Sequence, residues 1–166
     1  NFIAVCIMEE NGRMENNMAS RSYRKGFEFM TDDLVDLLAR EAVDKTAILF
    51  KAIKPKGGEM PVVMGAGGSG ILLHEAIGHA FEADFNRKRT SIFCDLLGKK
   101  VCDEHINVVD DGTIPFNRGS VNFDDEGVEG QKTYLVKDGI LTSYIHDRIS
   151  ARHYGVEPTG NGRRDT

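Results

Sequence analysis

Three residues with metal-binding or ionisable side chains, His74, Glu75 and His79, stand within six positions of an otherwise apolar, glycine-containing stretch. Neutral imidazole nitrogens suit a borderline-soft cation such as zinc, and a catalytic zinc site usually takes three protein ligands and leaves one position open. A glutamate beside a histidine ligand then acts as a general base toward the water held by the metal. The residue types therefore indicate metal-assisted hydrolysis.

The spacing of the two histidines departs from the common zinc-protease pattern, in which they stand four positions apart on one helix. His74 and His79 are five positions apart, and at about 100° per residue a regular α-helix would leave their side chains about 140° apart. A π-helical turn brings residues five apart close together and recurs at functional sites. We predict such a turn here, with Gly78 as the residue that relaxes the backbone.

The same residues have a plainer interpretation, in which His79 is a satisfied core histidine and Glu75 a solvated helix residue. The surrounding helix is apolar around much of its circumference, which predicts that it is buried. A buried histidine and glutamate need partners, and this favours a ligand. The apolar residues are Leu72, Leu73, Ile77 and Phe81.

The glycine-rich segment before the helix offers an alternative function. Gly65–Gly70 matches the G-x-G-x-x-G fingerprint of dinucleotide binding, after an expected strand at Met60–Met64. The full fingerprint requires a second strand ending in an acidic residue about twenty positions later, and the corresponding region, 84–95, has the pattern of a helix end and a loop. A tight turn that opens the helix is the simpler interpretation.

The first third of the chain predicts a hairpin followed by a packing helix. Strands at Phe2–Glu9 and from Met14 flank Asn11-Gly12, a favoured two-residue hairpin turn. Thr31 and the acidic residues after it are a typical helix start, and an apolar face continues to about Ala52.

From residue 106 onward the pattern changes to short strands and turns, with Asp138-Gly139 as a second hairpin signal and a helix at Asp147–Tyr154. We therefore predict an α+β fold, an antiparallel sheet with packed helices and the HExxxH helix at its centre. Residues 1–58 supply the hairpin and packing helix, and residues 59–166 the metal helix and strands of the same incomplete domain. The expected strands are Ile106–Val109, Ser120–Phe123, Thr133–Val136 and Ile140–Ile145.

Several other polar residues are interpreted as structural. The acidic group Asp124-Asp125-Glu126 lacks the ligand spacing of a calcium loop and is expected to be a solvated turn. The lone histidines His146 and His153 are expected to have no chemical role. The glycine-rich tail, 155–166, either frames a cleft or is disordered.

Composition limits the classes of function. The chain has 166 residues, with 21 basic against 26 acidic residues and a net charge of −5, which argues against direct nucleic-acid binding. It contains no apolar run of about 18 residues, so we expect no membrane span. The three cysteines lack paired spacing and indicate a reducing, cytoplasmic setting. Because the chain starts at Asn1 inside a strand pattern, we expect a fragment of a larger protein.

An ordered series of motifs between residues 60 and 164 resembles the TldD branch of the TldD/PmbA family, also called modulators of DNA gyrase. The motifs are Leu72–His79, Glu82-x-Asp84-Phe85-Asn86-Arg87, Thr90-Ser91, Val108–Thr113, Arg118-Gly119-Ser120, Asp124–Gly127 and Pro158–Arg164.

This resemblance implies a zinc metalloprotease in which His74 and His79 are metal ligands and Glu75 is the catalytic base. It further implies that the third zinc ligand is a cysteine outside this chain, so that the fragment alone is expected to be inactive. The implied substrates are unfolded or flexible peptides, and the implied assembly is a dimer with a related family subunit or a second copy. The opposing hypothesis is a non-enzymatic assembly module or a dinucleotide-binding domain that uses Gly65–Gly70.

Overall fold

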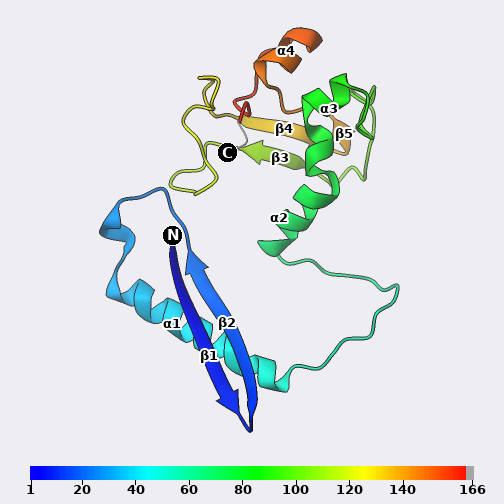
Figure 1. Ribbon diagram of the computed structural model, residues 1–166. Helices are drawn as coiled ribbons and strands as arrows, with labels where there is room; N and C mark the ends of the chain where they lie inside the picture. The colour runs from blue at the N-terminus through cyan, green and yellow to red at the C-terminus, as the bar shows by residue number, and fades with distance from the viewer. Residues whose placement is uncertain (164–166) are drawn as a thin grey trace. The chain divides into compact units, whose positions relative to one another are not determined.

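A computed structural model describes residues 1–163. The chain divides into two compact units (Figure 1). The first unit comprises Asn1–Pro61 with Phe116–Arg118, and the second comprises Val62–Pro115 with the described residues from Gly119 onward. Each unit is described by itself.

The first unit is a two-stranded hairpin with one long helix on one face. β1 (Phe2–Glu10) and β2 (Arg13–Arg21) pair antiparallel, as the sequence predicts. Asn11 and Gly12 both have positive φ, 53° and 79°, which the tight hairpin turn requires and which asparagine and glycine adopt most easily.

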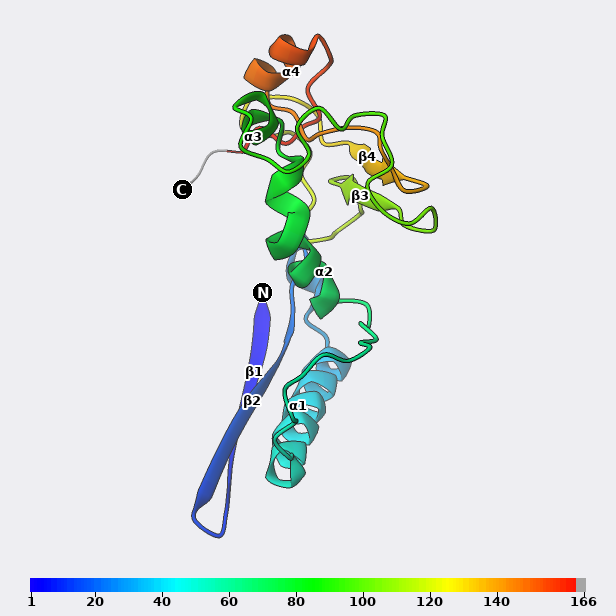
Figure 2. The same ribbon diagram turned by 90° about the vertical axis from the view of Figure 1, so that its right-hand side faces the viewer.

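The helix α1 (Asp32–Ala47) begins where predicted. Thr31 Oγ1 accepts a hydrogen bond from the Leu34 amide at 3.3 Å, which satisfies one of the free amides of the first turn. A 3₁₀ turn, η2 (Ile48–Lys51), continues the helix, and another, η1 (Phe27–Phe29), precedes it. Figure 2 shows α1 beside the hairpin, where its buried residues Leu38 and Ala42 pack against Ala19 of β2.

The second unit contains a small antiparallel sheet of order β3-β4-β5. The strands are β3 (Val108–Asp111), β4 (Lys132–Lys137) and β5 (Ile140–Leu141), with Asp138 and Gly139 in the predicted turn at φ 49° and 75°. α4 (Arg148–Tyr154) follows, and Asp147 caps it by accepting from the Ser150 amide at 2.8 Å. The predicted α+β class, with antiparallel strands and packed helices, is confirmed.

A series of short helical turns precedes this sheet in the chain. α2 (Gly68–Leu73) runs into a π-helical turn, η3 (His74–Gly78), then into a 3₁₀ turn, η4 (His79–Phe81), and finally α3 (Ala83–Arg87) follows. Figure 2 shows the helical ribbon that begins at the label α2.

Three strand predictions need correction. Met60–Met64 forms no strand, and Ser120–Phe123 contributes only an isolated bridge from Phe123 to Glu129. Of Ile140–Ile145, only the first two residues are in β5, because the chain then leaves β4 to bridge Ile145 to Glu82. An apolar run becomes a strand only where a neighbour pairs with its backbone, and the run itself does not contain that information.

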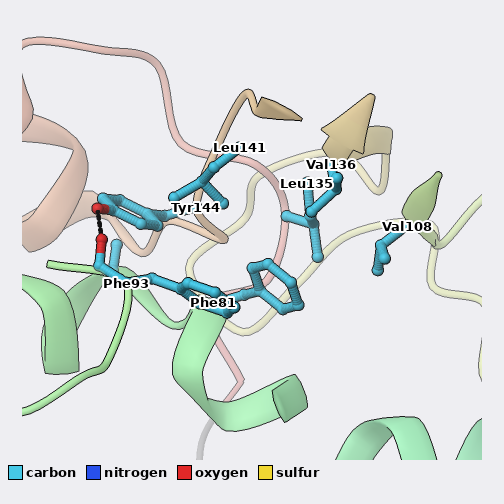
Figure 3. Packing of buried hydrophobic residues seen from close by; sticks show 8 residues of the cluster. Phe81, Phe93, Val108, Leu135, Val136, Leu141 and Tyr144 are labelled. Atoms are coloured by element: carbon cyan, nitrogen blue, oxygen red, sulfur yellow. Dashed lines mark hydrogen bonds between the residues drawn. The ribbon is translucent and has the colours of Figure 1, made fainter. Parts of the chain in front are cut away.

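The core of the second unit joins the helical series to the sheet. Phe81 and Phe93 stack with ring centroids 4.7 Å apart, and the Tyr144 hydroxyl donates to the Phe93 carbonyl at 2.6 Å (Figure 3). Phe81 is 1% exposed, so it fixes the end of the helical series in the core. The buried cluster is Phe81, Ala83, Phe93, Val108, Leu135, Val136, Leu141 and Tyr144.

The acidic group forms a turn at residues 125–126, as the sequence predicts, and Asp125 is exposed, but Asp124 is not solvated, since it is only 6% exposed. Its Oδ1 accepts from the amides of Glu126 and Val128 at 2.9 and 2.8 Å, and its Oδ2 accepts from the Gly162 amide at 2.8 Å. The glycine-rich tail is thereby held at Gly162, while Arg164 lies outside the described residues. Throughout residues 1–163 no helix has the length and apolarity needed to cross a membrane.

Candidate metal centre

The predicted π-helical turn is present and brings the two motif histidines together. It spans His74–Gly78, so that His79 follows it directly. The rings of His74 and His79 lie edge to face, with centroids 4.6 Å apart and an interplanar angle of 64°. Two imidazoles that bind one tetrahedral zinc through nitrogen at about 2.0 Å have ring centres about 5 Å apart. The two rings therefore stand at the separation that joint ligation needs.

Gly78 has a different role from the one predicted. Its φ and ψ, −56° and −50°, are ordinary helical values, so the turn does not use the conformational freedom of glycine. What matters is the missing side chain, because a Cβ at this position would lie 3.2 Å from Nδ1 of His74. Gly78 gives the His74 ring room to lie against the helix backbone.

The prediction of a buried motif helix is wrong for its first half. Ile71 and Leu72 are 68% and 55% exposed, and both His74 and Glu75 are exposed. Burial begins near the end of the series, at Phe81. The motif therefore lies at the edge of the core, and its polar side chains are open to solvent.

Glu82, to which sequence reasoning assigned no role, lies within hydrogen-bond distance of a motif histidine. Its Oε1 lies 2.5 Å from Nδ1 of His79. This hydrogen bond, helped by the charges of Glu82 and Glu75, raises the pKa of His79 above its ordinary value. The available signal was spacing, because a residue three positions after a histidine faces it across one helical turn.

The two imidazoles of His74 and His79 are ligands that suit zinc, but they are fewer than a zinc site needs. Glu82 engages Nδ1 of His79 and leaves Nε2 for a ligand, an arrangement common in zinc sites. Within residues 1–163 no three histidine, cysteine, aspartate or glutamate side chains are arranged to hold a metal ion. The two imidazole rings are close together, and a catalytic zinc site of the usual kind needs one protein ligand more.

A pocket of about 650 Å³ adjoins His74 in the second unit. Its walls come from Glu82–Asp84 and Arg87 on one side and from Ile145, Asp147 and residues 161–163 on the other. The glycine-rich tail thus lines a cavity beside the motif, as one of its two sequence interpretations proposed. The pocket is large enough to receive part of a peptide.

The lone histidine His146 fits its structural interpretation. It is 4% exposed and lies between the rings of Tyr144 and Tyr154, with centroids 6.1 and 5.5 Å away. Burial lowers the pKa of His146, which favours the neutral ring. The cysteines Cys6, Cys94 and Cys102 are free thiols, consistent with the expectation from their spacing.

The glycine segment shows no dinucleotide cradle in the described residues. Gly67 has φ 104° and makes the tight turn before α2, but no strand precedes it. The fingerprint depends on a strand, a turn and a helix packed in one unit, so its first component is missing.

Comparison with known families and proteins identifies relatives of the chain. The family described as PmbA/TldA metallopeptidase C-terminal domain matches residues 57–166. The "Metalloprotease TldD homolog" of Haemophilus influenzae is 46% identical over 165 residues, which cover 96% of this chain and 34% of that protein. The "Zinc metalloprotease TldD homolog" of Saccharolobus solfataricus is 36% identical over 144 residues, covering 86% and 32%. The chain thus spans about a third of these relatives.

Two crystal structures share the fold. TldE from Thermococcus kodakarensis superposes with a TM-score of 0.74 at 25% identity, over 96% of this chain and 35% of that one. A Thermotoga maritima protein described as a modulator of a DNA gyrase gives a TM-score of 0.75 at 23% identity, over 97% and 36%.

Proposed function

This chain belongs to the PmbA/TldD metallopeptidase family, and on that basis we propose that it carries the catalytic motif of a zinc-dependent peptidase. The observation that supports this most is the π-helical turn, which sets the rings of His74 and His79 4.6 Å apart despite their five-residue spacing. A relative of this chain is named a zinc metalloprotease. His74 and His79 are the proposed ligands and Glu75 the proposed general base.

Each residue has a distinct part in the reaction. His74 and His79 hold zinc, which when bound polarises a carbonyl and makes water more acidic. The Glu75 carboxylate takes one proton from the attacking water as oxygen adds to the peptide carbonyl carbon, and returns it to the leaving nitrogen as the C–N bond breaks. The position of Glu75 in the π-helical turn, next to the first ligand, supports this role.

The substrate we propose is an unfolded or flexible peptide. The pocket beside His74 is open to solvent. The outer edge of β5 is already paired with the backbone of residues 98–100, so the sheet edge that we propose for the peptide is that of β3. An extended peptide can bind such an edge through backbone hydrogen bonds, without the side-chain selection that a folded substrate would need.

The third zinc ligand is proposed to be a cysteine elsewhere in the full-length protein. Residues 1–166 alone should consequently bind zinc weakly and hydrolyse peptides poorly. We further propose a cytoplasmic assembly with a second PmbA/TldD-family subunit or a second copy, an idea supported by the structural likeness to TldE. Direct nucleic-acid contact is not proposed, given the net charge of −5.

The test is Glu75→Gln in the full-length protein. Loss of a general base typically costs a factor of about 10²–10⁴, so hydrolysis of an unfolded casein peptide should fall by at least about a hundredfold. Zinc content should stay at the parent level, because Glu75 is not a ligand. Glu104→Gln, an exposed glutamate of the same unit, is the matched control. Parent-level hydrolysis by Glu75→Gln would refute the mechanism.

A further inference from the structure

The two proposed ligands are held by different means. The His74 ring lies against the backbone at Gly78, where an added Cβ would approach its Nδ1 to 3.2 Å. The His79 side chain is 59% exposed, and its one hydrogen bond within the described residues is to Glu82. The His74 ring thus lies beside the helix backbone, whereas a single carboxylate holds the His79 ring.

The backbone of Glu82 is itself fixed. Its two neighbours pair with Ile145, since the Ala83 amide donates to the Ile145 carbonyl and the Ile145 amide donates to the Phe81 carbonyl, both at 2.9 Å. Phe81 is 1% exposed and anchors this bridge in the core. The position of Glu82 is thus determined by the fold rather than by the exposed helix that carries the motif.

A buried amide adds a second restraint. Asn86 is 3% exposed, and its Nδ2 donates to the carbonyls of Ala80 and Glu82, both at 2.8 Å. The loop that carries the carboxylate is therefore held from two directions. The Glu82 side chain, 35% exposed, reaches from this fixed loop to Nδ1 of His79.

A carboxylate at Nδ1 determines which nitrogen of a neutral imidazole carries the proton. Nδ1–H donates to Oε1 of Glu82, and Nε2 then keeps its lone pair. Partners of this kind fix both the tautomer and the ring orientation of metal-binding histidines. The neighbouring carboxylate Asp84 is engaged elsewhere, since it pairs with Lys88 at 2.7 Å.

We propose that Glu82 is a positioning residue that holds His79 as its Nδ1–H tautomer and aims Nε2 at the metal shared with His74. The inference rests on the proposed zinc function. It assigns Glu82 no bond to the metal, in keeping with the finding that no three ligand-type side chains of residues 1–163 converge.

The experiment compares the zinc dissociation constants of full-length variants by competition with a chromogenic chelator. Removing such a partner typically weakens metal affinity about 10- to 100-fold, so Glu82→Ala should raise Kd by that factor. Glu82→Gln should lose less zinc affinity, because its amide oxygen can still accept from Nδ1–H. Glu104→Gln is the matched control and should keep the parent Kd.

A second readout needs no metal. Nitrogen-15 NMR of the metal-free protein should show His79 chiefly as the Nδ1–H tautomer, and Glu82→Ala should shift it toward the Nε2–H form that free histidine prefers. His79→Ala identifies the signal. An unchanged tautomer together with an unchanged zinc Kd would overturn the inference.

Two other outcomes separate this inference from the proposed function. If Glu82→Ala abolished zinc binding as completely as His79→Ala, Glu82 would be a ligand and the positioning role would be wrong. If His74→Ala and His79→Ala both retained parent zinc affinity, the proposed function itself would fail, whatever Glu82 does.

Discussion

The two units of this chain are stabilised in different ways. The first has two strands of nine residues and a helix of sixteen, and its buried hydrophobic residues are Ala19, Leu38 and Ala42. The second has strands of four, six and two residues around a larger core, and its irregular segments carry the whole candidate metal centre. Regular elements stabilise the first unit, whereas side-chain hydrogen bonds to the backbone shape the second.

This contrast shows how irregular backbone in the second unit can hold the exposed side chains of the candidate metal centre in place. Asp124 holds the tail, Asn86 holds the loop at Glu82, and Thr159 Oγ1 accepts from the His146 amide at 2.7 Å. Each of these side chains satisfies amides or carbonyls that a strand or helix would otherwise pair. Replacing them should therefore disturb the site. In the first unit, a comparable loss of stability should come instead from truncating a buried apolar side chain.

The largest expected effect is that of Asp124→Ala. It leaves the buried amide of Gly162 and the half-buried amides of Glu126 and Val128 without their acceptor, and because a buried donor left unpaired costs about 1–3 kcal/mol, stability should fall by about 3 kcal/mol. Hydrogen exchange should accelerate at these three amides. Asp124→Asn, which keeps one acceptor oxygen, should lose less stability than Asp124→Ala. Unchanged protection in Asp124→Ala would contradict the account.

In the first unit the corresponding change is Leu38→Ala. Leu38 is fully buried at 0% exposure, and truncating a buried leucine costs about 2–5 kcal/mol. Exchange should accelerate in β1, β2 and α1 and stay at the parent rate in the second unit. Leu37→Ala is the matched control, because Leu37 is on the same helix and 52% exposed. Equal losses in the two variants would show that α1 does not pack as described.

The smallest expected effect concerns pH. Burial lowers the pKa of His146 in the folded state, while the unfolded side chain keeps a value near 6.5. The unfolded state therefore takes up the proton first, and His146 lowers the free energy of unfolding as pH falls from about 6.5 toward the folded pKa.

Urea unfolding of the parent and His146→Phe at pH 8 and pH 5 measures this contribution. The phenylalanine ring can occupy the space beside Tyr144 and Tyr154 without titrating. The variant should lose less stability between the two pH values than the parent. An identical loss in both proteins would show that His146 does not contribute to the pH dependence.

The sequence predicted the first unit well because its signals are local. Asn11-Gly12 encodes the turn and Thr31 the helix start, and both are found where expected. The Met60–Met64 strand was wrong, and so was the expected solvation of Asp124, because both depend on partners distant in the chain. The grouping of residues 1–58 and 59–166 within one domain stays a prediction.

In the candidate centre, spacing alone predicted the π-helical turn, since five positions between His74 and His79 require it for convergence. Spacing could not reveal that a Cβ at position 78 would crowd the His74 ring, because that depends on where the ring lies. Spacing put Glu82 one turn after His79, but it could not show that the backbone of Glu82 is held by the bridge between its neighbours and Ile145. The roles of His74, Glu75 and His79 in metal binding and catalysis stay proposals.

The most direct test of the central claim is the zinc content of the full-length protein, measured by elemental analysis beside His74→Ala, His79→Ala and the exposed control His105→Ala. We predict near one zinc per chain in the parent and the control, and little in the other two variants. Parent-level zinc in both His74→Ala and His79→Ala would contradict the account, and so would a freshly purified parent without zinc.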